Sequence, residues 1–281
     1  MSGTLYVTGT PIGNLEDITM RALRILGEVD FIAAEDTRVT RGLLTHFDLH
    51  TPLVSCNEHS TPQVYDSIAD RIEAGETCAI VTDAGMPCIS DPGEKLVRRC
   101  RERGIRVEAV PGPSAVVTAL SVSGGSTAQF AFYAFLPADK KQKKVREQLL
   151  CEIARERKTC ILYEAPHKLR STLDDLCRHL GGERCISLCR ELTKLHEEAL
   201  RMTLSQAVEY YRSTEPRGEY VLILRGAEKP AEEGPSLEEG LQQVRLLRQE
   251  GLSLKDAVKQ ASKACYIPKN TLYEAALSQQ A

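Results

Sequence analysis

The chain has 281 residues, of which 42% are hydrophobic and 27% charged. At about 100–200 residues per domain, this length predicts about two packed domains with large apolar cores. The 36 basic and 39 acidic residues give a formal net charge of −3. This excludes a global positive field that would attract nucleic acid, so any RNA contact must be local.

The first half of the chain alternates short apolar segments with stretches of helical periodicity. The predicted strands are residues 5–7, 31–34, 79–82 and 107–110; the predicted helices open at Asp17 or Thr19 and cover residues 65–74 and 93–103. This alternation is typical of a parallel α/β sheet. Each strand ends in a polar or Gly/Pro-rich loop. Because ligands bind beyond the carboxyl ends of parallel strands, we expect the site at these loops.

A second α/β set follows a linker of small residues at 121–126. Its predicted strands are residues 130–135, 159–163, 184–189 and 220–224, and its predicted helices lie near 143–155, 167–180 and 203–213. Residues 227–235, rich in Glu, Pro and Gly, predict a second linker. We therefore expect an N-terminal α/β domain (1–118), a second α/β domain (119–228) and a C-terminal helical segment (236–281).

Several classes of protein are disfavoured by the sequence. The longest apolar runs are far shorter than the ~20 residues that cross a bilayer, and no secretory signal is recognisable, so a cytoplasmic protein is expected. Ten cysteines are scattered without a Cys-x-x-Cys pair, which predicts free thiols. Cys185 and Cys189 have His179 and His196 nearby, but they lie in a segment typical of a strand rather than a tight turn, so no metal site is predicted.

The loop from Asp83 to Gly93 holds two prolines, two glycines and two carboxylates. A loop constrained in this way is typically shaped around a ligand. Asp91 is also expected to cap a helix that starts at Pro92. The two roles are compatible.

Three further loops each allow two interpretations. Residues 10–14 match neither the dinucleotide nor the nucleoside-triphosphate glycine motif. They either form part of a ligand site or simply connect a strand to a helix. Ser114 follows a strand and either caps a helix or offers its hydroxyl to a ligand. Glu35, Asp36 and Arg38 place a candidate general base and a phosphate-binding arginine at a strand end, although the segment taken alone favours a surface ion pair.

Eight collinear blocks combine these loops: residues 10–19, 33–38, 83–93, 111–113, 135–137, 163–167, 190–194 and 218–219. Together they resemble the tetrapyrrole-methylase-like S-adenosylmethionine-dependent methyltransferases, and within them the branch that methylates cytidine 2′-hydroxyls of small-subunit ribosomal RNA. The resemblance covers residues 5 to about 225. The departures from the family pattern are mild, such as Gly9 before Thr10 and Met86 and Cys88 in the third block.

The resemblance implies two α/β domains of the tetrapyrrole methylase type, normally in a homodimer, with S-adenosylmethionine in the cleft between the domains. It implies a decoding-centre cytidine of 16S ribosomal RNA in the 30S subunit as substrate. The residues implied to bind the cofactor are Pro11, Gly13, Asp83, Ala84, Gly85, Pro87, Ser114 and Ala115 in the first domain, and Leu136, Glu164, Leu192 and Thr193 in the second.

Methyl transfer to a ribose hydroxyl is an in-line displacement, which requires the oxygen about 3–3.5 Å from the methyl carbon and a group that removes its proton. Glu35 or Asp36 is the candidate base, and Arg38 is the candidate for holding the neighbouring phosphate. A metal is not needed, because the sulfonium is already a good leaving group.

Two basic segments are candidates for RNA contact. One contains Lys140, Lys141, Lys143, Lys144 and Arg146; the other lies in the tail with Lys255, Lys259, Lys263 and Lys269 against Asp256 and Glu274. The tail pattern of helix, turn and helix opened by Pro268 resembles a helix-turn-helix. A solvated helix start and a helical hairpin packed on the second domain are the respective alternatives.

Two other functions remain open from the sequence. A methylase of a small corrin or porphyrin precursor shares the implied fold, although such a substrate does not require a basic helical tail. A regulator could instead bind nucleic acid through its tail and use the α/β body to sense a ligand. Binding of S-adenosylmethionine without methyl transfer would favour the regulator.

Overall fold

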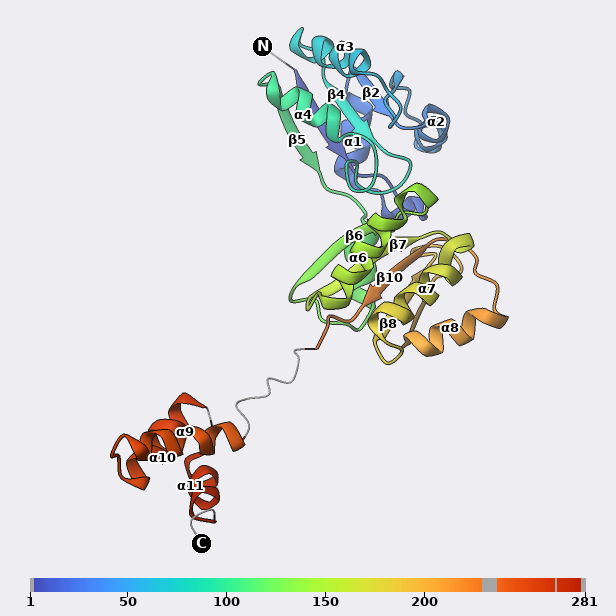
Figure 1. The fold of residues 1–281 in the computed structure, drawn as a ribbon. Helices are drawn as coiled ribbons and strands as arrows, with labels where there is room; N and C mark the ends of the chain where they lie inside the picture. The colour runs from blue at the N-terminus through green and yellow to red at the C-terminus, as the bar shows by residue number, and fades with distance from the viewer. Residues whose placement is uncertain (1–2, 229–236, 266, 279–281) are drawn as a thin grey trace. The chain divides into compact units, whose positions relative to one another are not determined.

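The computed structural model describes residues 3–228, 237–265 and 267–278. The chain divides into two compact units, Met1–Gly226 and Ala227–Ala281. The first unit contains two five-stranded sheets, and the second contains three helices (Figure 1).

The first sheet is entirely parallel, with strand order β3-β2-β4-β1-β5. Its strands are β1 (Thr4–Thr8), β2 (Phe31–Ala34), β3 (Leu53–Ser55), β4 (Cys78–Val81) and β5 (Arg106–Val110). All residues of β2 and β4 are buried, as expected for central strands of a sheet that is covered on both faces. The four predicted strands are confirmed. The short edge strand β3 was not predicted.

Helices cover both faces of this sheet. They are α1 (Met20–Glu28), α2 (Thr37–His46), α3 (Pro62–Glu73) and α4 (Glu94–Glu102). Leu26 of α1 and Leu44 of α2 pack in one core, whereas Ile72 of α3 and Leu96 of α4 pack in the other. The hydroxyl of Thr19 accepts a hydrogen bond from Ala22 N–H at 3.1 Å, so Thr19 is the cap of α1.

The prediction that Asp91 caps a helix starting at Pro92 is wrong. The helix α4 begins at Glu94, and its N-cap is Gly93, which has φ +126°. This conformation is accessible to glycine and turns the chain after Pro92. Asp91 therefore lies in the loop before the helix, where its carboxylate is not engaged in capping.

The second sheet is mixed, with order β6-β7-β10-β8-β9. Its strands are β6 (Phe130–Phe135), β7 (Thr159–Glu164), β8 (Cys185–Arg190), β9 (Glu198–Thr203) and β10 (Tyr220–Leu224). Only β6 and β7 run parallel. The helices α6 (Lys143–Arg155), α7 (Pro166–Leu180) and α8 (Leu204–Ser213) confirm the predicted positions. The edge strand β9 was not predicted.

Helix α5 (Ala115–Val122) connects the two halves of the first unit. Its Val116, Ala119 and Leu120 pack against Ile161 and Val221 of the second sheet. The opposite face of that sheet forms a separate core with α6, α7 and α8. The expected domain boundary between residues 118 and 119 thus falls inside α5, and the expected linker begins within that helix.

The second unit consists of α9 (Leu237–Gln249), α10 (Leu254–Ala264) and α11 (Lys269–Ser278). Val244, Val258 and Leu272 form its apolar core, one from each helix. The hydroxyl of Ser253 accepts a hydrogen bond from Asp256 N–H and caps α10. The predicted helical tail is confirmed. Within the described ranges, no helix is both long and apolar enough to span a membrane.

Candidate ligand-binding site

The loops after β1 and β4 are joined by their backbones. Thr10 N–H donates to the Gly85 carbonyl at 2.9 Å, and Gly85 N–H donates to the Thr10 carbonyl at 3.2 Å. Gly85 has φ +88°, which favours glycine at this position. These bonds hold the predicted loops at one edge of the first sheet, as expected from the meeting of parallel strand ends there.

A pocket of about 430 Å³ lies between these loops and the strand ends of the second sheet. This volume is in the range of small-molecule sites. Six residues predicted to bind the cofactor line it: Ala84, Gly85, Ser114, Ala115, Glu164 and Leu192. The structure thus brings together residues that are separated by more than 100 positions in the sequence. We call this space the inner pocket.

A second pocket, of about 340 Å³, adjoins the first. Ile12, Ala84, Lys194 and Glu219 line both spaces. Three further residues predicted to bind the cofactor line the second one, namely Pro11, Gly13 and Asp83. We call this space the outer pocket.

The remaining three predicted cofactor residues line neither pocket. Leu136 is only 4% exposed and packs in the core of the second sheet. Pro87 lies in the loop after β4. Two other residues of that loop, Met86 and Ile89, line the inner pocket. The hydroxyl of Thr193 is buried and has no hydrogen-bond partner among the described residues.

The predicted carboxylates lie directly behind the wall of the outer pocket. Glu35 accepts hydrogen bonds from the Thr82 hydroxyl at 2.5 Å and from Asp83 N–H at 3.3 Å. Asp36 N–H donates to the Asp83 carboxylate at 3.2 Å. Both bonded residues, Thr82 and Asp83, line the outer pocket. These bonds bring Asp83 together with Glu35 and Asp36, although 48 and 47 positions separate Asp83 from these two residues in the sequence.

Asp36 and Arg38 form the surface ion pair that was the alternative interpretation. The Arg38 guanidinium donates to both oxygens of Asp36, at 3.0 and 2.6 Å. These bonds, together with the donation from Arg38 N–H, lower the pKa of Asp36 to about 2. The Arg38 side chain is 89% exposed, so its outer face is accessible to an anion.

Two further carboxyl groups have raised pKa values. Burial, followed by the nearby charge of Glu35, raises the pKa of Asp83. Burial also raises the pKa of Asp91 to about 6, with smaller contributions from Glu35 and Asp83. Asp91 lines the inner pocket. The sequence predicted both a helix cap at Asp91 and a ligand role for its loop with two prolines, and the position of Asp91 at the pocket agrees with the second.

Ser114 occupies the N-cap position of α5, but its side chain makes no capping hydrogen bond. It lines the inner pocket. Because the hydroxyl is not needed by the helix, it is available to a ligand. The geometry therefore favours the ligand interpretation over the capping one.

Aromatic residues of the second sheet complete the inner pocket, and the sequence did not identify them as site residues. Phe135, Tyr163 and Tyr220 line it. The rings of Phe135 and Tyr163 are 5.4 Å apart between centroids. Burial raises the pKa of Tyr163 to about 12, so its hydroxyl stays protonated. Tyr163 directly precedes Glu164, and that adjacency was the signal in the sequence.

The basic segments are only partly available to RNA. Lys141, Lys143 and Lys144 are exposed, as are Lys255, Lys259 and Lys269 on α10 and α11. The side chain of Lys140 lies outside the described residues. Arg146 belonged to the predicted basic run, but it turns inward and binds Asp175. No group of three or more potential metal ligands occurs among the described residues.

Comparison with known proteins identifies two family models along the chain. A model described as Tetrapyrrole (Corrin/Porphyrin) Methylases matches residues 4–208. A model described as RsmI C-terminal HTH domain matches residues 234–280. The two matches correspond to the α/β body and to the helical tail.

Similar proteins with curated names cover nearly the whole chain. A protein of Halalkalibacterium halodurans named Ribosomal RNA small subunit methyltransferase I is 46% identical over 96% of this chain and 93% of its own length. A protein of the same name from Escherichia coli O157:H7 is 42% identical over 99% of this chain and 96% of its own. One from Thermotoga maritima is 44% identical over 80% of this chain and 100% of its own.

Solved structures show the same fold at low identity. The methyltransferase CobJ has a TM-score of 0.61 and 18% identity over 80% of this chain and 95% of its own. Uroporphyrin-III C-methyl transferase from Thermus thermophilus, solved with S-adenyl homocysteine, has a TM-score of 0.55 and 19% identity over 79% of this chain and 97% of its own. The body described above is therefore a tetrapyrrole methylase fold.

Proposed function

The chain belongs to the ribosomal RNA small subunit methyltransferase I family of tetrapyrrole-type methylases, and from this membership we propose that it methylates 16S ribosomal RNA with S-adenosylmethionine. The proposed acceptor is the 2′-hydroxyl of a decoding-centre cytidine. The observation that carries the proposal is the match over the whole chain, tail included. The solved methyltransferase structures described above cover 80% and 79% of this chain.

The inner pocket fits S-adenosylmethionine by its chemistry. It combines the aromatic rings of Phe135 and Tyr163 with the unengaged hydroxyl of Ser114 and the carboxylates of Asp91 and Glu164. Apolar walls with a few placed polar groups are typical of cofactor sites. When bound, the cofactor supplies an activated methyl group on a sulfonium. The residues proposed to hold it include Gly85, Ser114, Ala115, Glu164 and Leu192.

The outer pocket is proposed to receive the acceptor ribose. It adjoins the inner pocket; Asp83 lines it, and Glu35 and Asp36 lie behind Asp83 and are hydrogen-bonded to it. A carboxylate here would remove the proton of the 2′-hydroxyl. Glu35 is the better candidate, because the ion pair with Arg38 makes Asp36 a weak base with a pKa of about 2. Arg38 would hold the adjacent phosphate on its exposed face.

Further features concern the surroundings of the enzyme. We propose a homodimer that works in the cytoplasm, where 30S subunits are. Two apolar side chains are exposed: Val117 on α5 is 53% accessible, and Phe130 on the edge strand β6 is 42% accessible. Their exposure supports a dimer interface that includes these two side chains. Lys141, Lys143 and Lys144 on the body and Lys255, Lys259 and Lys269 on the tail would contact RNA phosphates.

The test is transfer of tritiated methyl from S-adenosylmethionine to undermethylated 30S subunits, naked 16S RNA and a porphyrinogen extract, followed by nuclease mapping of labelled ribose. Label on the 2′-oxygen of a decoding-centre cytidine is the expected result. Label only in the tetrapyrrole fraction would replace the proposed substrate by a small precursor. Cofactor binding with no transfer to any acceptor would favour the ligand-sensing regulator.

A further inference from the structure

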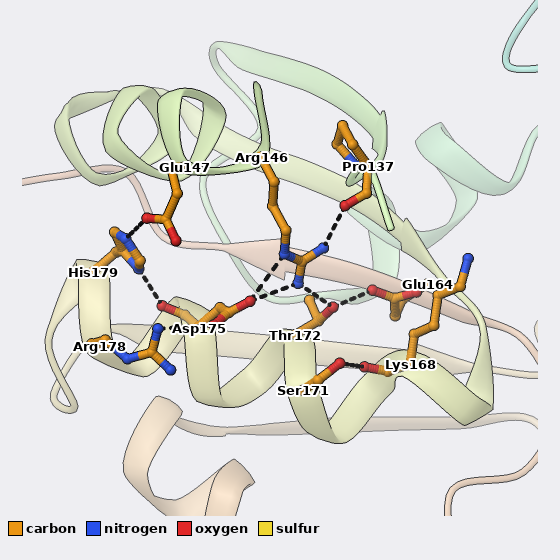
Figure 2. A network of polar contacts seen from close by, with 10 residues as sticks. All are labelled: Pro137, Arg146, Glu147, Glu164, Lys168, Ser171, Thr172, Asp175, Arg178 and His179. Carbon is orange, nitrogen blue, oxygen red and sulfur yellow. Dashed lines mark hydrogen bonds and ion pairs between the residues drawn. The ribbon is translucent and has the colours of Figure 1, made fainter. Parts of the chain in front are cut away.

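Arg146 on α6 is the centre of a polar network beneath the second sheet (Figure 2). Its side chain is only 16% exposed. The guanidinium donates to the Asp175 carboxylate at 2.9 Å, to the Pro137 carbonyl at 3.2 Å and to the Thr172 hydroxyl at 3.1 Å. One largely covered cation thus connects the start of α6 with α7 and with the segment that follows β6.

The direction of the hydrogen bonds in this network is fixed by chemistry. A guanidinium has only donors, so the Thr172 hydroxyl must accept from Arg146. The single hydroxyl proton is then left for the carboxylate of Glu164, at 2.5 Å. The other oxygen of Glu164 accepts from Ala165 N–H at 2.9 Å. Glu164 is therefore held as an acceptor on both oxygens.

One end of this network reaches the inner pocket, and another lies close in the chain to a residue that lines it. Glu164 is 4% exposed and lines the pocket at the N-terminus of α7. Pro137 lies two residues after Phe135, which lines the same pocket. Each carboxylate oxygen of Glu164 has a further lone pair beyond the bonds described. The carboxylate can therefore accept a hydrogen bond from a ligand.

We propose that Arg146 and Thr172 are positioning residues of the cofactor pocket: Arg146 orients Thr172, Thr172 orients Glu164, and Glu164 accepts a hydrogen bond from a donor group of the cofactor. Arg146 also fixes the segment after Phe135 through the Pro137 carbonyl. The proposal rests on the proposed function, because it assumes that the inner pocket holds S-adenosylmethionine. Neither Arg146 nor Thr172 lines the inner or the outer pocket, so both would act through Glu164 or the backbone.

Glu164 is a buried acceptor, and a buried acceptor that loses its donor is left in that position without a replacement for the lost hydrogen bond. Glu164 can replace the lost hydrogen bond by rotating away from the pocket or by binding a water molecule. Either change removes the alignment of its carboxylate toward the ligand. Loss of the Thr172 hydroxyl should therefore weaken cofactor binding.

The experiment compares Thr172→Val with Thr172→Ser. Valine keeps the β-branched shape and removes the hydroxyl, whereas serine keeps the hydroxyl. Binding of S-adenosylhomocysteine is measured by calorimetry on the full chain. We expect Thr172→Val to weaken binding at least tenfold and Thr172→Ser to remain within about threefold of wild type. In the transfer assay, Thr172→Val should raise the KM for S-adenosylmethionine with little change in kcat at saturation.

A matched control lies on the same helix pair. His179 on α7 binds Glu147 of α6 at 2.8 Å, away from Glu164. His179→Gln should lower the melting temperature without changing the affinity, so it separates a stabilising role from a positioning one. Arg146→Lys keeps the charge but loses the fork of donors, and it should weaken binding as Thr172→Val does. If Thr172→Val does not fold, Arg146→Lys carries the test.

The outcomes distinguish this proposal from the proposed function. Wild-type affinity in folded Thr172→Val and Arg146→Lys would overturn the positioning role alone. A wild-type protein that binds no S-adenosylhomocysteine would overturn both the positioning role and the cofactor assignment. Equal weakening in Thr172→Val and His179→Gln would mean that the network acts only through stability, which also contradicts the proposal.

Discussion

Gly13 packs directly against the side chain of Lys194. A Cβ atom on Gly13 would stand 2.5 Å from Lys194 Cγ and 3.1 Å from the Thr193 hydroxyl oxygen. Lys194 in turn binds Glu191 at 2.9 Å and Glu219 at 3.1 Å, and it lines both pockets. The loop after β1 and the loop after β8 thus meet at a position where only a hydrogen atom fits.

Gly13→Ala is expected to weaken binding of S-adenosylhomocysteine, by about tenfold, because the added methyl group must displace Lys194 from its two carboxylates. Calorimetry on the purified variant measures this. Gly27→Ala on α1 is the control, since the new Cβ meets only Leu49 Cδ2, at 3.2 Å. Wild-type affinity in Gly13→Ala would show that the contact does not shape the pocket.

Glu35→Gln is expected to lower kcat for methyl transfer by about 100-fold or more, because loss of a general base typically costs 10²–10⁴ in rate. Affinity for S-adenosylhomocysteine should stay the same, since Glu35 lies behind the wall of the outer pocket and does not line the inner one. Single-turnover transfer to 30S subunits gives the rate. A smaller loss is expected for Asp36→Asn, because the ion pair with Arg38 already weakens that carboxylate as a base. A larger effect in Asp36→Asn would reverse the assignment of the base.

Asp91→Asn is expected to stabilise the protein near neutral pH. Burial raises the pKa of Asp91 from 3.8 to about 6, so the folded state holds the proton more tightly than the unfolded state. The folded wild type therefore loses stability as the pH rises from about 4 through 6, and the variant does not. After allowance for solvent screening, the gain at pH 7.5 is about 1 kcal/mol, or about 2–4 °C in Tm. Scanning calorimetry at pH 4 and 7.5 tests this, and an equal difference at both values would contradict it.

Lys143→Glu combined with Lys144→Glu is expected to weaken binding to 16S RNA and to reduce its dependence on salt. Each phosphate contact that is lost should lower the slope of log K against log salt by up to about 1. Filter binding over a series of salt concentrations measures both quantities. Lys95→Glu combined with Lys158→Glu makes the same change of charge at other exposed lysines. An unchanged slope in the first pair, or an equal change in the control, would exclude a local contact at α6.

A chain that ends at Gly226 is expected to bind S-adenosylhomocysteine with wild-type affinity but to bind RNA more weakly. Both pockets lie within the unit Met1–Gly226, and the Thermotoga maritima relative aligns over its whole length with 80% of this chain. Calorimetry and filter binding on the shortened chain give the two affinities. Loss of cofactor affinity would mean that the tail contributes to the site, and unchanged RNA affinity would remove its proposed role.

The sequence by itself determined the elements whose patterns are local. Apolar runs such as β2 and β4 are buried on both faces, so every residue must be apolar. The sequence left Asp17 or Thr19 as the start of α1, and the structure makes Thr19 the cap. The edge strands β3 and β9 were missed: β3 has only three residues, and β9 is partly exposed along its length, so neither has a continuous apolar signature. Of the twelve residues that the collinear motifs proposed for cofactor binding, nine line one of the two pockets.

Only the tertiary structure decided which of these groups act together and which are occupied elsewhere. The sequence predicted that Arg146 belongs to a basic surface. In the structure its side chain packs against Asp175, because the turn of α6 that carries it faces α7. The sequence predicted a helix cap at Asp91, but Gly93 takes the cap position and Asp91 lines the inner pocket. Burial and hydrogen-bond partners depend on residues distant in the chain. A local pattern can therefore predict that a carboxylate or a guanidinium is present, but not whether it is free to bind a ligand.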